Sequence, residues 1–183
     1  MAKTARYVAF LRGINVGGRN KISMSDLRAT FVDRGFGAVS TYIQSGNVVF
    51  ASDAKPATLE SDIEGTLERR FGVPLVVVVR SQLQLRRVIE SAPPGFGAAP
   101  ELYHSDVVFL KSPLTSEQAM QVVQRREGVD QAWPGSGVVY FARLSARRAQ
   151  SRMSSIMGTP EYKLMTIRNW ATTTKLLSLL QAS

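Results

Sequence analysis

The segment from Arg12 to Ser23, which reads RGINVGGRNKIS, combines the residue types that bind anions. Glycines let backbone amides turn toward a ligand, and amides that converge in this way accept negative charge. We expect the segment to follow a strand and to end at a helix N-terminus, where the helix dipole adds positive charge. These features favour a phosphate or carboxylate ligand. The candidate ligand-binding residues here are Arg12, Gly13, Asn15, Gly17, Gly18, Arg19, Asn20 and Lys21.

This glycine-rich segment matches neither common nucleotide motif. The G-x-G-x-x-G spacing of dinucleotide-binding folds is absent, and no Gly-Lys-Ser/Thr follows as it would in a Walker loop. An alternative interpretation is a long connection between a strand and a helix, in which the glycines only turn the chain.

The segment Tyr42–Asn47, which reads YIQSGN, is a second candidate. Ser45 and Asn47 could present polar groups to a ligand. The same residues are ordinary in a hairpin turn, because glycine and asparagine tolerate positive φ, and that interpretation is favoured. Ser45 does not lie in a G-x-S-x-G elbow, so it is not interpreted as a nucleophile.

A third candidate, TIRNWATTTK over residues 166–175, places Arg168 and Asn169 where a strand meets a helix. Such a junction suits an anion. Trp170 could stack on a ring of the ligand, although a tryptophan in the first turn of an amphipathic helix more often joins the core. Arg168 is equally suited to clamp a structural carboxylate.

Catalytic and metal chemistry have little support in the composition. The chain has no Cys and one His, which excludes a thiol nucleophile, a cysteine zinc site and a histidine pair. We therefore predict no metal and no cofactor. His104 is interpreted as a surface histidine without a local partner, and no carboxylate pair has a distinctive spacing. Catalytic residues stay unassigned, and whether the chain is an enzyme stays open.

Positive charge gathers at the two ends of the 183-residue chain, whose formal net charge is +9. Residues 1–28 carry +5, residues 143–183 carry +6, and the middle carries −2. This asymmetry favours a phosphorylated or polyanionic partner, with a solvated basic surface as the alternative. Four arginines near one expected helix would then contact phosphates: Arg143, Arg147, Arg148 and Arg152.

Two halves with the same order of elements must position these segments. The first half is expected to form strands at 7–11, 39–43, 48–51 and 75–79, with helices over 24–34 and 59–67. The second is expected to form strands at 103–110, 129–133, 138–144 and 163–167, with helices over 115–126 and 147–157. A helix follows each half, one opening at Ser81 and one capped by Asn169.

The β-α-β-β-α-β order predicts an α+β fold made of two tandem ferredoxin-like (split β-α-β) units with antiparallel sheets. We place an N-terminal domain with the glycine-rich loop at 1–91, a proline- and glycine-rich linker at 92–101, and a C-terminal domain ending in a helix at 102–183. The main alternative is one larger α/β sheet. The aromatic signature of RNA-binding sheets is absent, because Gly46–Phe50 contains one aromatic residue.

Membrane insertion is not expected. The longest aliphatic run, Leu75–Val79, is too short to cross a bilayer, and no apolar signal-peptide region precedes the first strand. We expect a cytoplasmic protein with no membrane partner.

The segments YVAFLRGINVGG at 7–18, YIQSGNVVF at 42–50 and TIRNW at 166–170 closely resemble the bacterial family called domain of unknown function 1697. The resemblance implies an α+β fold whose N-terminal part is ferredoxin-like, and it implies no reaction. The recurrent motif positions map to Arg12, Gly13, Asn15, Gly17, Gly18, Asn20, Lys21, Ser45, Gly46, Asn47, Arg168, Asn169 and Trp170.

Three hypotheses about function follow. The preferred one is an anion-binding module for phosphate-bearing ligands, a nucleotide or a nucleic acid, with the Arg12–Lys21 loop approaching Arg168 in one basic cleft. The second is an enzyme acting on a small phosphorylated or carboxylated metabolite. The third is a structural role, with homo-oligomers forming through exposed sheet edges.

Overall fold

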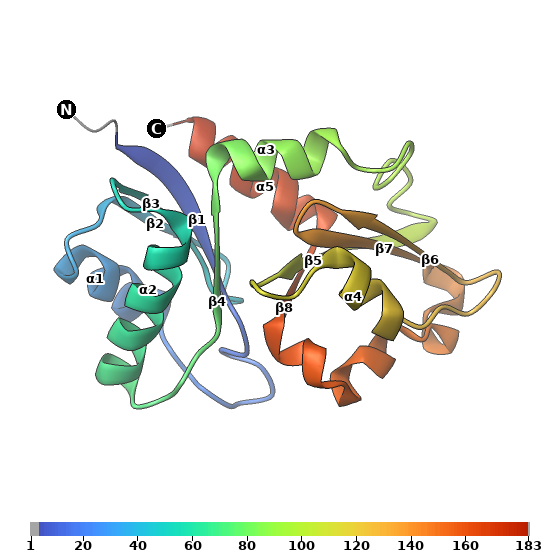
Figure 1. The fold of residues 1–183 in the computed structure, drawn as a ribbon, viewed down its shortest axis with the longest axis horizontal. Coiled ribbons are helices and arrows are strands. Elements are labelled where there is room, and N and C mark those ends of the chain that lie inside the picture. The colour runs from blue at the N-terminus through green and yellow to red at the C-terminus, as the bar shows by residue number, and fades with distance from the viewer. Residues whose placement is uncertain (1–3, 183) are drawn as a thin grey trace. The chain divides into compact units, whose positions relative to one another are not determined.

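The structure, a computed structural model, describes residues 4–182 and has an α+β fold. It contains two four-stranded antiparallel sheets, with the strand orders β2-β3-β1-β4 and β6-β7-β5-β8 (Figure 1). The single larger sheet considered above is therefore wrong. The chain divides into two compact units: Met1–Arg86 with Leu176–Ser183, called unit 1, and Arg87–Lys175, called unit 2.

Unit 1 contains the first sheet and the two helices packed on it. Its elements are β1 (Ala5–Leu11), α1 (Met24–Asp33), β2 (Gly37–Tyr42), β3 (Asn47–Ser52), α2 (Pro56–Phe71) and β4 (Val77–Ser81), and α3 (Gln82–Glu90) leads into unit 2.

Unit 2 repeats the strand order with different helical elements. It contains β5 (Tyr103–Leu110), α4 (Ser116–Val122), β6 (Asp130–Gly135), β7 (Val138–Leu144), three 3₁₀ segments η1 (Ser145–Gln150), η2 (Met153–Gly158) and η3 (Pro160–Leu164), and β8 (Met165–Asn169). Helix α5 (Trp170–Gln181) begins in unit 2, and its last residues belong to unit 1.

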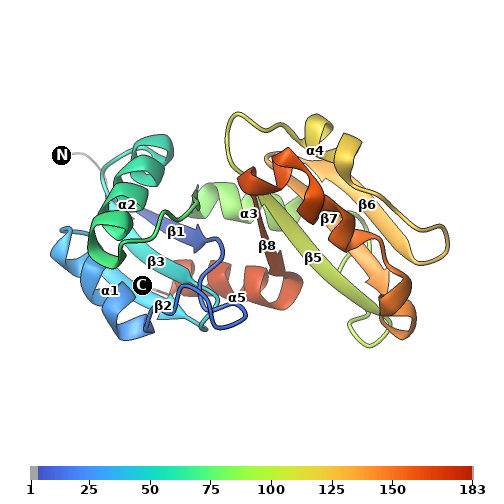
Figure 2. The ribbon, with the colours of Figure 1, turned by 90° about the horizontal axis from the view of Figure 1, so that it is seen from below.

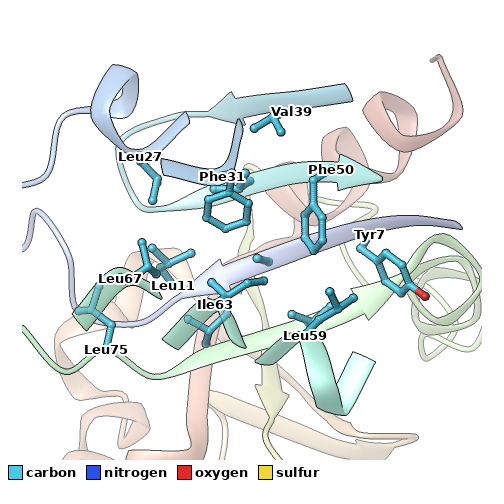
Figure 3. Packing of buried hydrophobic residues seen from close by; sticks show 14 of the residues in the cluster. Tyr7, Leu11, Leu27, Phe31, Val39, Phe50, Leu59, Ile63, Leu67 and Leu75 are labelled. Carbon is cyan, nitrogen blue, oxygen red and sulfur yellow. The ribbon is translucent and has the colours of Figure 1, made fainter. Parts of the chain in front are cut away.

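The core of unit 1 lies between its sheet and helices α1 and α2 (Figure 3). In β1, alternate side chains point toward the helices, as the two-residue period of a strand requires. Leu59, Ile63 and Leu67 recur every four residues along α2 and are at most 1% exposed. Phe50 packs edge-on against Phe31, with ring centroids 5.5 Å apart. This core fixes the ends of β1 and β3, from which the candidate loops project.

Local capping signals place the helix starts as predicted. Ser23 Oγ accepts a hydrogen bond from the Asp26 amide (3.0 Å) and Thr115 forms a reciprocal capping box with Gln118. Ser81 and Gln84 bond each other in the same reciprocal way at the start of α3. These side chains satisfy amides that have no partner inside the helix.

The helix predicted over 147–157 is wrong, and α4 ends before the predicted residue 126. One buried carboxylate bonds a backbone amide in each of these two regions, which removes that amide from a helix. Asp130 Oδ2 accepts hydrogen bonds from the amide of Arg126 (2.8 Å) and the amide of Arg152 (2.9 Å). The Arg152 amide therefore cannot bond the carbonyl four residues earlier, and the chain forms 3₁₀ segments. The helix prediction rested on Ala149, Met153 and Ile156. Met153 and Ile156 do lie in the core, whereas Ala149 is exposed.

Residues 92–101 contain no helix or strand, yet they belong to unit 2 and pack within it. The Phe96 ring lies edge-on to the rings of Tyr140 (5.3 Å), Trp170 (5.1 Å) and Trp133 (6.0 Å). The boundary between the two compact units lies within α3 and again within α5. The predicted domain limits lie at residues 91 and 102. The predicted outer ends, residues 1 and 183, lie outside the described residues. Those limits stay a prediction.

Candidate functional site: the glycine hairpin and the β2–β3 turn

Residues 15–20 of the connection between β1 and α1 fold back on themselves in a short turn, which we call the glycine hairpin (Figure 2, blue loop). Val16 and Arg19 pair across it, and the Arg19 amide donates to the Val16 carbonyl (3.0 Å). Gly17 and Gly18 have φ of +57° and +76°, as the two central residues of a type I′ turn require. The glycines therefore do turn the chain. Among the described residues, neither of their amides has an acceptor.

Two asparagines, Asn15 and Asn20, hold the hairpin from inside. Asn15 Nδ2 donates to the carbonyls of Ile22 (2.9 Å) and Gln44 (3.0 Å), while its Oδ1 accepts from the Ile22 amide (2.9 Å). Asn20 Nδ2 donates to the Gly13 carbonyl (3.0 Å). Both asparagines have positive φ, which their short polar side chains tolerate. These two predicted ligand contacts thus use their amide groups to build the loop.

The turn between β2 and β3 packs against the base of the same loop. The Leu11 amide donates to the Gly46 carbonyl (2.8 Å), and a Cβ on Gly46 would lie 2.7 Å from Ile14 Cδ1. Asn47, fully buried, donates to the Tyr42 carbonyl (3.0 Å) and to Ser45 Oγ (3.1 Å). Ser45 and Asn47 therefore close the turn, which is the interpretation favoured above.

The N-terminus of α1 already carries a negative charge. The Asp26 carboxylate lies in its first turn and accepts the hydroxyl proton of Ser23 (2.7 Å). A carboxylate at this place interacts favourably with the helix dipole and reduces its attraction for an external anion. An anion site in this connection is therefore better placed at the hairpin tip than at the helix N-terminus.

The hairpin tip is exposed and cationic. Arg19 and Lys21 are exposed, Arg12 is half-buried, and no acidic residue occurs between residues 12 and 25. The side chains of Arg19 and Lys21 have no ion-pair partner within residues 4–182. Two full charges therefore lie close in sequence to the unbonded amides of the exposed Gly17 and Gly18, a combination typical of anion sites.

The third predicted segment is embedded in unit 2. Arg168 is buried, donates to the Ile167 carbonyl (2.8 Å), and loses hydration, which lowers its pKa to about 10. Asn169 Oδ1 caps α5 by accepting from the Thr172 amide (2.7 Å). Trp170 packs against Phe96. Because the glycine hairpin belongs to unit 1, its convergence with Arg168 on one anion stays a prediction.

Sequence reasoning missed a buried charged cluster around His104, and its interpretation as a histidine without a local partner is wrong. His104 Nε2 lies 3.1 Å from Asp106 Oδ1, and Arg143 lies 3.5 Å from Asp106 Oδ2. Asp106 is 5% exposed. The signal was present in the sequence. His104 and Asp106 have one residue between them in a predicted strand, and the side chains of such a pair point to the same face of the sheet. Arg143 is thus paired with a carboxylate, and its contact with phosphates stays a prediction.

The edges of the unit 1 sheet bear on the assembly hypothesis. The outward amides of edge strand β4 are bonded by side chains of α2: Glu64 accepts from Val77 (2.9 Å) and Glu60 accepts from Val79 (2.9 Å). The opposite edge strand, β2, is interrupted by a bulge. Both features oppose pairing with another chain.

Two further expectations concern metals and membranes. Within residues 4–182, no group of three His, Cys, Asp or Glu side chains is placed to hold a metal ion. No helix in this described part has the length and apolar character needed to span a membrane.

Comparisons with known proteins agree on the fold and assign no activity. A family model described as "Protein of unknown function (DUF1697)" matches residues 4–140, which include the glycine hairpin and the β2–β3 turn. The chain is also similar to the solved structure of conserved bacterial protein SP0830 from Streptococcus pneumoniae, with 24% identity and a TM-score of 0.83. That likeness covers 97% of this chain and 99% of the other. No match was found among curated proteins.

Proposed function

The chain belongs to DUF1697, a family of proteins of unknown function, and we propose that unit 1 binds phosphate-bearing ligands, a nucleotide or a nucleic acid, at the glycine hairpin. The observation that carries this proposal is that some polar groups of the loop bond within it and others do not. The asparagine amides are used inside it, while the amides of Gly17 and Gly18 have no acceptor among the described residues and the side chains of Arg19 and Lys21 are exposed. Because internal hydrogen bonds already hold the loop in shape, little conformational entropy is lost when its donors bind a ligand.

We further propose that both units are ferredoxin-like. The support is the order β1-α1-β2-β3-α2-β4 in unit 1 and the matching strand order in unit 2. In unit 2, 3₁₀ segments occupy the place of the second helix.

The matching strand orders permit an internal comparison of loop length. In unit 1, residues 12–23 connect the first strand to the first helix, whereas residues 111–115 make the same connection in unit 2. Unit 2 forms a sheet with the matching strand order although this connection is less than half as long. The additional residues of unit 1 are therefore not required to build such a sheet, and loops that exceed the need of the fold commonly carry function.

Removing the two exposed cations should weaken binding strongly. We expect Arg19→Ala with Lys21→Ala to lower the affinity for a single-stranded oligonucleotide at about 50 mM salt by tenfold or more. The log–log dependence of affinity on salt should lose about one unit of slope for each lost contact. Fluorescence anisotropy across a salt series measures both quantities.

A matched control removes equal charge from the same unit. Arg69 and Arg70 are exposed in the last turn of α2, so Arg69→Ala with Arg70→Ala should leave affinity within about twofold. Equal losses in the two double variants would mean that net charge, and not the glycine hairpin, governs binding. No binding of nucleotides or oligonucleotides by the unaltered chain at about 50 mM salt would remove the proposal.

A further inference from the structure

Ile43, in the turn between β2 and β3, occupies a backbone conformation that its side chain disfavours. Its φ is +50°, and its side chain is 48% exposed. For a β-branched residue the left-handed region is strained, and glycine or asparagine would be the usual choice. Burial does not offset this strain, because about half of the side chain faces solvent. Neither the conformation of the turn nor packing in the core therefore explains why position 43 is an isoleucine.

A second exposed aliphatic side chain lies on the loop that is bonded to this turn. Val16, in the glycine hairpin, is 65% exposed. The hydrogen bond from Asn15 Nδ2 to the Gln44 carbonyl joins the residue before Val16 to the residue after Ile43. Two exposed, branched aliphatic residues thus neighbour, along the chain, the two residues that join the loops.

The same hairpin relates this apolar pair to the cations. Val16 and Arg19 face each other across the antiparallel bridge, so their side chains leave the hairpin on the same side. A ligand that contacts Val16 therefore also meets a guanidinium group. The surface suits a molecule with an anionic part beside a compact apolar part.

We infer that the ligand of the glycine hairpin is a nucleoside phosphate, whose base lies against Val16 and Ile43 while its phosphate meets Arg19, Lys21 and the glycine amides. This inference rests on the proposed function and adds the two side chains that contact the base. A nucleobase offers a compact apolar face, which two branched side chains can contact, whereas binding of an acyl chain gains from each additional CH₂ that is buried. The nucleoside phosphate can be a free nucleotide or one residue of a single strand.

Calorimetric titration of the full chain with pyrophosphate and with the four common nucleoside diphosphates separates the two parts of the ligand. At low salt, at least one nucleoside diphosphate should bind about tenfold more tightly than pyrophosphate. Ile43→Asn should reduce that affinity to the level of pyrophosphate and leave pyrophosphate binding unchanged. Ile43→Val, which keeps a branched aliphatic side chain, should retain most of the difference.

The Ile43→Asn variant should also become more stable, which separates lost contact from lost folding. Relief of the left-handed strain should raise its melting temperature by about 4 °C. Ala38, exposed in the bulge of β2 with φ of +47°, provides the control. Ala38→Asn relieves comparable strain in the same unit and should leave all affinities unchanged.

The outcomes of the titration distinguish the inference about the base from the proposed binding of phosphate. Equal binding of pyrophosphate and every nucleoside diphosphate would overturn the inference and leave the proposed function standing. An unchanged preference in Ile43→Asn would overturn it as well. A short single-stranded oligonucleotide that binds more tightly than its nucleotide, and loses that affinity in Ile43→Asn, would support the inference with a nucleic acid as the source. No binding of any of these probes would remove both claims.

Discussion

Replacing Gly46 by alanine should destabilise unit 1 by about 2–5 kcal/mol. Gly46 has φ of +85°, which costs any residue with a Cβ roughly 1–2 kcal/mol. The added Cβ would also lie 2.7 Å from Ile14 Cδ1 and 2.9 Å from Leu11 Cβ. Ile14 and Leu11 are buried and cannot move aside freely, so overpacking contributes a further ~1–3 kcal/mol. Urea unfolding followed by the amide signals of unit 1 measures the change.

Gly72 provides the control for backbone strain without overlap. It ends α2 with φ of +68°, and a Cβ there would meet nothing within 4 Å. Gly72→Ala should therefore cost only about 1 kcal/mol. If Gly46→Ala destabilises unit 1 no more than Gly72→Ala does, the close packing of the β2–β3 turn against the base of the loop is wrong.

Replacing Asp106 by alanine should destabilise unit 2 by about 3–5 kcal/mol. The carboxylate lies 3.5 Å from Arg143, whose side chain is 14% exposed, and 3.1 Å from His104. Removal of the carboxylate would leave the buried guanidinium without its counter-charge, and an unpaired buried charge is costly. Asp106→Asn should lose a large part of the same stability, since it keeps the size of the side chain and removes the charge.

An exposed ion pair in unit 1 provides the comparison. Arg34 and Asp62 lie 2.8 Å apart, but the Arg34 side chain is 46% exposed. Asp62→Ala should cost about 0–1 kcal/mol, because water screens and replaces such a pair. Urea unfolding followed by far-UV circular dichroism serves both variants, and Trp133 and Trp170 report on unit 2. Equal costs at Asp106 and Asp62 would contradict a buried role for Asp106.

The parts of the fold that could be predicted from sequence are those determined by neighbours along the chain. Helix starts were found because Ser23, Thr115 and Asn169 each bond an amide three residues away. The helical face of α2 was found because its apolar residues recur every four positions. Both signals are contained within one element.

The errors arose where a distant side chain decided the local structure. Asp130 accepts hydrogen bonds from the amides of Arg126 and Arg152, and neither amide can then take part in the helix predicted around it. The spacing of Met153 and Ile156 gave no sign of this carboxylate. Similarly, the linker composition of residues 92–101 did not show that Phe96 packs among three aromatic rings.

The candidate site was predicted as a segment but not in its internal roles. Composition identified the residues from Arg12 to Lys21, and the structure assigns the asparagines to the scaffold and the glycines to a type I′ turn. Sequence could not assign Asn15 to the Gln44 carbonyl, because that hydrogen bond depends on the meeting of two loops. It also could not show that Ile43 has positive φ, since β-branched residues rarely do.

Titration of the full, isotope-labelled chain with pyrophosphate, followed by amide chemical shifts, tests anion binding at the glycine hairpin most directly. The amides of Gly17 and Gly18 should show the largest and saturable shifts, and added salt should reduce them. Gly35, a glycine of unit 1 with φ of +97° and open space around it, should stay unshifted. Largest shifts in the arginine-rich residues 147–152, or no saturable shift at Gly17 and Gly18, would contradict the account.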